Sequence, residues 1–325
     1  MTTRINLKEI WKTRELSTLF VLALEVAFFT WYLWPEAGRS HPFFNVGNFV
    51  LVLKYSSLYG IAAIGAAMVI ISGGVDLSPG AVMALSGVVT GQLFVIQGYP
   101  LSVGVAGGIV TGLLAGMLSA LLVVAVKLPP FISTLGVMGI ARGIAFIITE
   151  GRFFDLSSRL PPGWKPFGLP ADWVAPIVLV VLAAVFQYLM QRFQWGRAIF
   201  AIGGNETAAL FSGIRVARVK ASVYLVAAVL ASLSGVILVV IQGQGRADLA
   251  TGYELDIIAS SVVGGASLTG GRGSVVGAVL GTLIFGVLRN ALPQIPGATF
   301  YDRLIVGVVV VVIVVVDQFI ARKGA

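Results

Sequence analysis

Residues 191–220 read QRFQWGRAIFAIGGNETAALFSGIRVARVK and form the longest internal polar interruption between segments that have the composition of membrane helices. The stretch carries five basic residues against a single acidic residue, Glu206. Basic loops between membrane spans stay on the cytoplasmic side. A short helix is predicted in the middle, after Gly203-Gly204-Asn205 and before Gly213. The segment is therefore predicted to be a structured cytoplasmic projection that contacts a soluble partner.

The composition around this segment is that of a polytopic membrane protein. The chain has 325 residues, of which 58% are hydrophobic and only 11% charged, and its mean hydropathy is +0.97. Soluble domains usually have about 25% charged residues. The net charge of +8 comes from basic residues that flank apolar runs, so we expect a lipid bilayer and no nucleic acid as partner. With no cysteine and one histidine, His41, no metal site is expected.

Apolar runs predict an all-α polytopic fold of about ten transmembrane helices, because a bilayer core needs about 20 apolar residues per helix. We treat residues 1–325 as one transmembrane domain, and the N-terminus lacks the pattern of a cleaved signal peptide. The second and eighth spans are short and are expected to be broken or re-entrant. The predicted spans are residues 16–34, 57–72, 79–97, 101–126, 131–149, 173–191, 219–241, 252–268, 273–290 and 301–320.

The distribution of basic residues predicts the orientation. With the N-terminus inside, thirteen Lys and Arg residues fall on the cytoplasmic side and seven on the other side. This bias places both termini, including residues 1–15, in the cytoplasm together with the 191–220 loop. The outer 150–172 loop, rich in proline and glycine, is expected to be compact. It is either a connector or a docking surface for an extracytoplasmic partner.

Two glycine-rich breaks resemble each other. Residues 73–80, GGVDLSPG, and residues 264–271, GGASLTGG, both join closely spaced spans. Broken helices often line the polar path of a transporter, although glycine also serves tight helix packing. Asp76 is expected to cap the helix that begins near Pro79, with ion binding as the alternative. The candidate path residues are Gly73, Gly74, Asp76, Ser78, Gly264, Gly265, Ser267 and Thr269.

Few other polar groups lie within the spans. Glu25, Arg142 and Arg289 are charged, and Arg142 is expected to pair with a carboxylate or a helix end. No chain of carboxylates or histidines crosses the membrane, which argues against a carrier driven by protons or sodium. Amides and hydroxyls that suit either a sugar-like solute or helix packing are Gln92, Gln97, Gln242, Gln244, Ser86, Thr90, Thr134 and Asn290.

Enzyme motifs are missing from the sequence. It contains no G-x-x-x-x-G-K-[ST] phosphate loop, so this chain does not hydrolyse ATP in the usual way. A membrane-embedded enzyme would need a cluster of carboxylates or histidines at a membrane face, and none can be assembled. We therefore expect no catalytic residues and no cofactor in this chain.

Four segments carry a family resemblance: residues 71–87, ISGGVDLSPGAVMALSG; residues 128–152, LPPFISTLGVMGIARGIAFIITEGR; residues 196–214, GRAIFAIGGNETAALFSGI; and residues 252–284, GYELDIIASSVVGGASLTGGRGSVVGAVLGTLI. In this order they resemble the carbohydrate-type permease subunits of bacterial ATP-binding-cassette importers. The resemblance covers most of residues 43–320 and does not specify the sugar.

The resemblance implies a multi-pass permease of the bacterial inner membrane that translocates a monosaccharide or related polyol. Its implied partners are a second permease copy, identical or different, a cytoplasmic ATPase that binds ATP and Mg²⁺, and a periplasmic sugar-binding protein. The alternative is a self-contained secondary transporter or channel for a small polar solute.

In this family the segment at 196–214 would couple the permease to the ATPase. Asn205 is expected to cap a helix of about two turns that Gly213 ends, and its apolar residues would enter a groove of the ATPase. The related E-A-A-x-x-x-G pattern of other importers is only approximated, and its downstream I-x-L-P is absent. The candidate coupling residues are Gly203, Gly204, Asn205, Glu206, Ala208, Ala209, Leu210, Phe211, Ser212 and Gly213.

Overall fold

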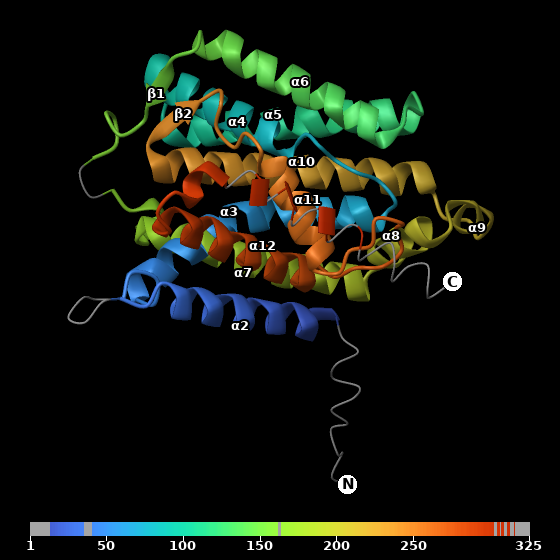
Figure 1. The fold of residues 1–325 in the computed structure, drawn as a ribbon. Coiled ribbons are helices and arrows are strands. Elements are labelled where there is room, and N and C mark those ends of the chain that lie inside the picture. The colour runs from blue at the N-terminus through green and yellow to red at the C-terminus, as the bar shows by residue number, and fades with distance from the viewer. Residues whose placement is uncertain are drawn as a thin grey trace.

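The computed structural model describes residues 14–35, 41–161 and 164–301, with a few positions between 304 and 315. Long helices lie side by side, and the short helix α9 and a two-stranded ribbon of β1 and β2 stand at opposite ends of the bundle (Figure 1). We call these the α9 end and the ribbon end. The predicted all-α membrane fold is confirmed.

The first half of the chain supplies α2 to α6. Short π-helical turns extend two of these helices, and a strand and a 3₁₀ turn follow the last. The elements are α2 (Arg14–Tyr32), α3 (Val46–Ile71), α4 (Pro79–Gly91), η1 (Gln92–Ile96), α5 (Leu101–Ala120), η2 (Leu121–Ala125), α6 (Pro130–Thr149), β1 (Phe153–Asp155) and η3 (Pro166–Gly168).

The second half supplies α7 to α12. Two short helices, α8 and α9, separate the long helices α7 and α10. The elements are α7 (Ala171–Arg192), α8 (Gln194–Gly204), α9 (Glu206–Phe211), α10 (Val216–Gln242), β2 (Gln244–Arg246), α11 (Tyr253–Val263), α12 (Val275–Ala291), η4 (Leu292–Gln294) and η5 (Ala298–Tyr301).

Eight of the described helices are long and apolar enough to span a bilayer. The predicted eighth span is the short helix α11, which has only 11 residues, as expected for a broken element. Most of the predicted tenth span, 301–320, lies outside the described residues.

The second span is neither short nor broken, and its predicted start at residue 57 is wrong, because α3 is a continuous helix of 26 residues that begins at Val46. Two polar side chains near its start interrupt the apolar run, and tertiary contacts satisfy both. The Lys54 ammonium lies 2.7 Å from the Asp172 carboxylate of α7, and Asn48 exchanges amide hydrogen bonds of 2.9 Å with Asn290. Paired in this way, both residues fit inside a membrane helix.

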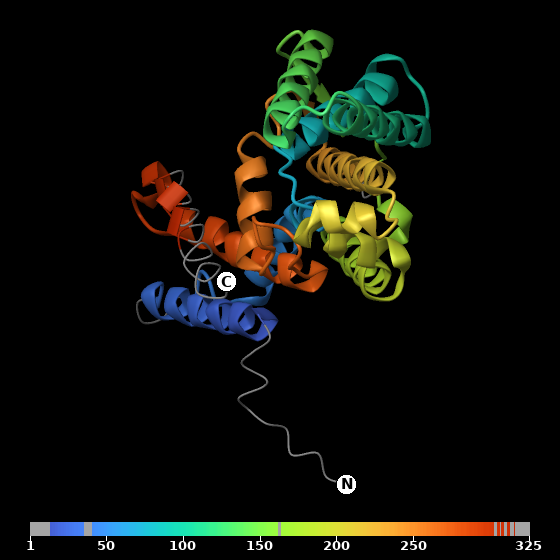
Figure 2. The same cartoon turned by 90° about the vertical axis from the view of Figure 1, so that its right-hand side faces the viewer.

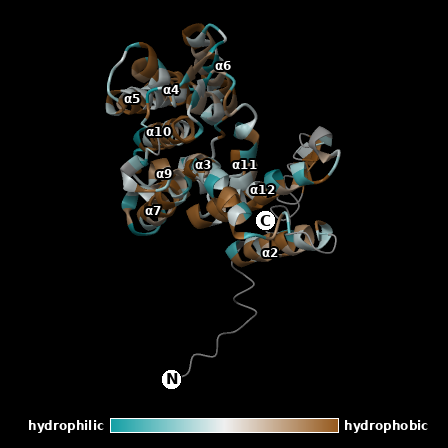
Figure 3. Ribbon diagram, turned by 90° about the vertical axis from the view of Figure 1, so that its left-hand side faces the viewer, coloured by the Kyte–Doolittle hydropathy of each residue, from teal (hydrophilic) through white to brown (hydrophobic). Residues whose placement is uncertain are grey.

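Helix α10 lies between two groups of helices. On one side are α4, α5 and α6, and on the other are α3, α7, α11 and α12 (Figures 2 and 3). Helix α3 is buried continuously from Ser56 to Ile71 and forms the centre of the second group. Large apolar side chains remain exposed on α2, α5, α6 and α7, as expected of surfaces that face lipid.

Glycines let α5 approach its neighbours closely. Gly104 and Gly108 lie against α4, and Gly112 and Gly116 lie against α10. A Cβ atom on Gly112 would overlap the Ser232 side chain and lie 2.7 Å from the carbonyl oxygen of Ala228. These glycines follow the small-residue rule of membrane helix interfaces.

Replacing Gly112 by alanine should therefore destabilise the bundle by about 1–3 kcal/mol, because the new methyl group pushes α5 away from α10. The measurement is the unfolding temperature of the detergent-purified protein. Gly136→Ala in α6 is the matched control, since a Cβ there meets no atom within 4 Å. Equal unfolding temperatures for the two variants would contradict the packing role.

Candidate coupling and translocation site

Helix α9 has the predicted local structure. The Asn205 side chain accepts a hydrogen bond from the Ala208 N–H at 2.9 Å, and Gly213 follows the helix with φ +84°. Lys220 of α10 lies 2.6 Å from the Glu206 carboxylate and ties the first turn of α9 to the bundle. Gly203 and Gly204, which precede this helix as predicted, are the last residues of α8.

The apolar residues of α9 divide into two faces. Leu210 and Phe211 are 59% and 86% exposed, and Ala208 is exposed beside them. Ala209, expected on the same surface, is instead buried against Ile202 of α8 and Val216 of α10. Its small side chain lets α9 sit directly on the bundle. Ala208, Leu210 and Phe211 thus form an exposed apolar tip, which is typical of a protein contact site.

The end of α8 is packed backbone to backbone against two other segments. A Cβ atom on Gly203 would overlap the carbonyl oxygen of Ile71, the last residue of α3, and would lie 2.5 Å from the amide nitrogen of Gly271. Ile71 and Gly271 are also hydrogen-bonded to each other, since the Gly271 N–H donates to the Ile71 carbonyl at 2.9 Å. Candidate coupling residues and candidate path segments, distant in sequence, meet at this point.

The two glycine-rich breaks end their helices in the same way. After α3 and after α11, the backbone turns through a Schellman motif, in which a residue with positive φ bonds back to the helix. That residue is Gly73 (φ +83°) in one break and Gly265 (φ +98°) in the other. The structure therefore pairs Gly73 with Gly265, one residue away from the sequence alignment of the two breaks, which paired Gly73 with Gly264.

Beyond this shared turn the two breaks diverge. Residues 74–78 run without helical structure to Pro79, whereas the loop after α11 closes on itself through the Ser267 N–H and the Arg272 carbonyl, 3.0 Å apart. The hydroxyls of Ser267 and Thr269 lie 2.9 Å from each other in this loop. The two glycine-rich breaks are therefore alike only in how the preceding helices end.

The non-helical segment 74–78 is buried or half-buried, and side chains bind two of its backbone N–H groups. Asp76 accepts from the backbone N–H and the hydroxyl of Ser78 at 2.8 and 2.7 Å, directly before Pro79. Asp76 thus holds Ser78, the residue before α4, and no hydrogen bond joins its carboxylate to the first turn of the helix itself. Thr134 of α6 accepts from the Leu77 N–H at 3.1 Å, which shows a role for this hydroxyl in holding the break. Irregular backbone at membrane depth requires such partners.

Two arginines within the spans have partners that the sequence did not identify. Arg142 of α6 donates to the carbonyl oxygens of Ala247 and Leu249 at 2.6 and 2.8 Å, not to a carboxylate or a helix end. Arg289 of α12 pairs at 2.7 Å with Asp256 of α11, whose side chain is fully buried. The sequence carried a signal for the Arg289–Asp256 pair, because the two residues have opposite charges and lie in adjacent predicted spans.

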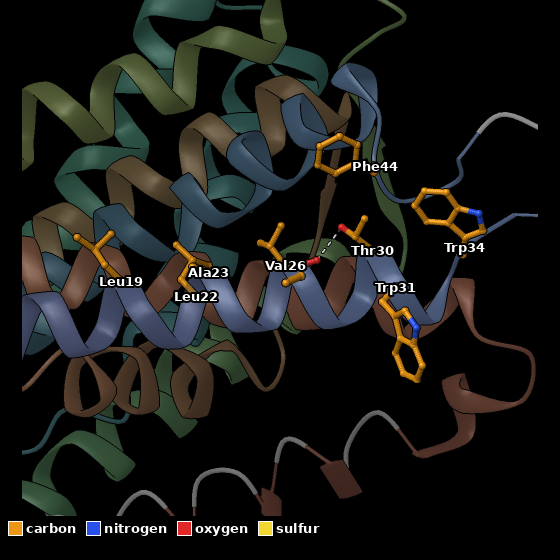
Figure 4. A pocket seen from close by; sticks show the side chains of 9 residues that line it. Leu19, Leu22, Ala23, Val26, Thr30, Trp31, Trp34 and Phe44 are labelled. Atoms are coloured by element: carbon orange, nitrogen blue, oxygen red, sulfur yellow. Dashed lines mark hydrogen bonds between the residues drawn. The ribbon is translucent and has the colours of Figure 1, made fainter.

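A groove of about 680 Å³ along α2 does not have the chemistry of a sugar site. Its lining side chains are apolar except for Thr30, whose hydroxyl donates to the Val26 carbonyl at 2.7 Å (Figure 4). Trp31 and Trp34 stand at one end of it, as aromatic residues do at membrane interfaces. We assign this groove to contact with lipid.

Comparisons with known proteins agree with this architecture. The family described as "Branched-chain amino acid transport system / permease component" matches residues 48–314. The ribose import permease protein RbsC of Bacillus subtilis is 38% identical over 83% of this chain and 84% of its own length, and that of Escherichia coli K12 is 36% identical over 85% and 87%. The D-allose transport system permease protein AlsC of Escherichia coli K12 is 33% identical over 94% and 92%.

No solved structure matches the chain. The family match covers most of the sequence, and both glycine-rich breaks and the segment with α8 and α9 lie inside it. The chain therefore belongs to this family of importer permease subunits.

Proposed function

We propose that this chain is the membrane-spanning subunit of an ATP-driven importer that carries a monosaccharide or related polyol across the bacterial inner membrane. The family description names amino acids, but the relatives that cover most of the chain are named for ribose and allose. The observation that carries the coupling part of the proposal is the exposed tip of α9 joined to the helix breaks through Gly203.

The α9 end is the proposed cytoplasmic face and the docking place of the ATPase. Ala208, Leu210 and Phe211 would enter a groove of that subunit, which binds ATP and Mg²⁺. A push on α9 is passed on because Glu206, Ala209 and the cap at Asn205 fix this helix to the bundle. The Gly203 contact then carries the movement to the ends of α3 and of the loop after α11.

The ribbon end is the proposed outer face, where a sugar-binding protein docks. Antiparallel pairing of β1 with β2 makes part of the 150–172 loop rigid. Beside it, Arg246 and Asp248 form an exposed ion pair at 2.6 Å, and Arg152 lines the same hollow of about 550 Å³. Hydrogen bonding to Arg246 lowers the pKa of Asp248, so its charge persists in mildly acidic surroundings.

A second permease copy, identical or different, completes the proposed assembly, and the sugar would pass between the two copies. The candidate path residues keep this role as a proposal: Gly73, Gly74, Asp76, Ser78, Gly264, Gly265, Ser267 and Thr269. Import direction follows from the different affinity of the inward and outward states for the sugar and for the loaded binding protein.

Uptake by membrane vesicles tests the proposal as a whole. Vesicles that contain this chain with the ATPase that co-purifies from native membranes, and with the binding protein, should take up sugar only when ATP is supplied. A protonophore should not slow this uptake. Full uptake by the chain alone, driven by an ion gradient, would instead support a secondary transporter or channel.

Phe211→Ala should weaken association with the ATPase about tenfold or more, because a fully buried Phe side chain contributes about 1.5–3 kcal/mol. The measurement is co-purification of the ATPase from membranes that hold equal amounts of permease. Phe153→Ala is the control, since Phe153 is 58% exposed but lies in β1, at the ribbon end. Equal recovery of the ATPase with both variants would argue against docking at the α9 tip.

Gly203→Ala should uncouple ATP hydrolysis from sugar uptake, because the new methyl group forces α8 away from Ile71 and Gly271. We expect the ATPase to bind and hydrolyse ATP while uptake falls at least tenfold. Gly204→Ala is the matched control, since its Cβ meets no atom within 4 Å. Normal uptake by the Gly203 variant would show that movement does not pass through this contact.

A further inference from the structure

A second cavity lies at the ribbon end, far from α9. It has a volume of about 380 Å³ and opens between the first half of α3 and the last turns of α12. This volume is in the range of small-molecule sites. Its lining includes Tyr55 and Tyr59 on α3, and Arg289, Asn290 and Gln294 on the other wall.

The amide groups on one wall are held in fixed positions. Asn290 and Asn48 exchange two hydrogen bonds of 2.9 Å each. The amide nitrogen of Gln294 donates to the backbone carbonyl and the side-chain oxygen of Asn290 at 3.0 and 3.1 Å. Because these side chains are already ordered without a ligand, binding would cost little of their conformational entropy.

The charge of Arg289 is balanced inside the protein. Its guanidinium lies 2.7 Å from the carboxylate of Asp256, which has no exposed side-chain surface. Arg289 is the only Lys, Arg, Asp or Glu among the described residues that line the cavity. The cavity is thus polar but close to neutral, and it fits a neutral solute better than a carboxylate or a phosphate.

Aromatic rings form the opposite wall. Tyr59 is 6% exposed, and its ring meets that of Tyr253 of α11 edge to face, with centroids 4.5 Å apart. Tyr55, one turn earlier, is 38% exposed. Two phenol rings facing amides and a guanidinium provide apolar contact on one side and hydrogen bonds on the other. A sugar, with C–H faces and hydroxyl edges, has the complementary chemistry.

We propose that this cavity holds the neutral sugar after its release at the outer face. The inference rests on the proposed import function and adds the place of binding and the preference for uncharged pentoses, hexoses or polyols over sugar acids and sugar phosphates.

The chain has no cysteine, so one introduced thiol reports on the cavity. Leu51 lines it and is 44% exposed, and Leu51→Cys leaves every polar group in place. In the assembled transporter, we expect the thiol to react with a water-soluble maleimide. A transported neutral sugar from a panel of pentoses and hexoses should slow the reaction at least threefold, whereas the corresponding sugar acids should not. Pro293→Cys in the same cavity is the second reporter if Leu51→Cys assembles poorly.

Gln97→Cys is the control for the labelling, because Gln97 is exposed at the end of η1 and does not line the cavity. Its labelling should not depend on sugar. A cavity thiol that never reacts, or one that no transported sugar protects, would overturn the site while leaving the import function standing. Protection without ATP-driven uptake would support the site and overturn the function, and the absence of both would overturn both.

Loss of one hydrogen bond tests the recognition chemistry. Gln294→Met keeps the Asn48–Asn290 pair and removes an amide from the wall. We expect the ratio of uptake rates between two sugars of the panel to change about threefold to tenfold. Gln97→Met should leave the ratio unaltered. An unaltered ratio in Gln294→Met would show that this wall does not contact the sugar.

Discussion

The need to satisfy every backbone hydrogen bond inside a bilayer is the constraint on which this structure depends. Helices meet it by themselves, but residues 74–78 do not form a helix and are buried or half-buried. The side chains of Asp76 and Thr134 accept hydrogen bonds from the backbone N–H groups of Ser78 and Leu77. The break can exist only because α6 packs beside it and contributes Thr134. A short non-helical path through the bundle is thereby held in one shape.

The same requirement applies at the carbonyl end of α3. The orphan carbonyl of Ile71 is taken up by the Gly271 N–H from the loop after α11, and Gly203 closes over this contact. One small region at the α9 end thus joins three segments that are far apart in sequence. Backbone packed on backbone without intervening side chains transmits displacement with little loss, because no rotamer can absorb it. This rigidity makes the region suitable for coupling.

The two ends of the bundle have different chemistry. At the α9 end, apolar side chains on a short helix are exposed next to a glycine-rich junction. At the ribbon end, amides, tyrosines and a neutralised arginine surround a cavity, and charged residues lie beside a short ribbon. An importer subunit needs such an asymmetry, because a protein partner that moves acts on one end and a polar solute enters at the other.

Properties that depend on neighbouring residues were predictable from the sequence alone. Apolar runs predicted the helices, and the Asn205 cap, the Gly213 end of α9 and the role of Asp76 before Pro79 all follow from contacts within a few residues. Properties that depend on distant residues were decided by the tertiary structure. Pairing with Asp172 and Asn290 lets Lys54 and Asn48 lie within α3, and packing on α8 and α10 buries Ala209.

Two further contacts were also decided by the tertiary structure. Gly203 packs against Ile71 and Gly271, and Arg289 pairs with Asp256. Hydropathy and capping are short-range signals that a sequence carries directly. Close approach between helices depends on the shape of both partners, which exists only once the chain has folded.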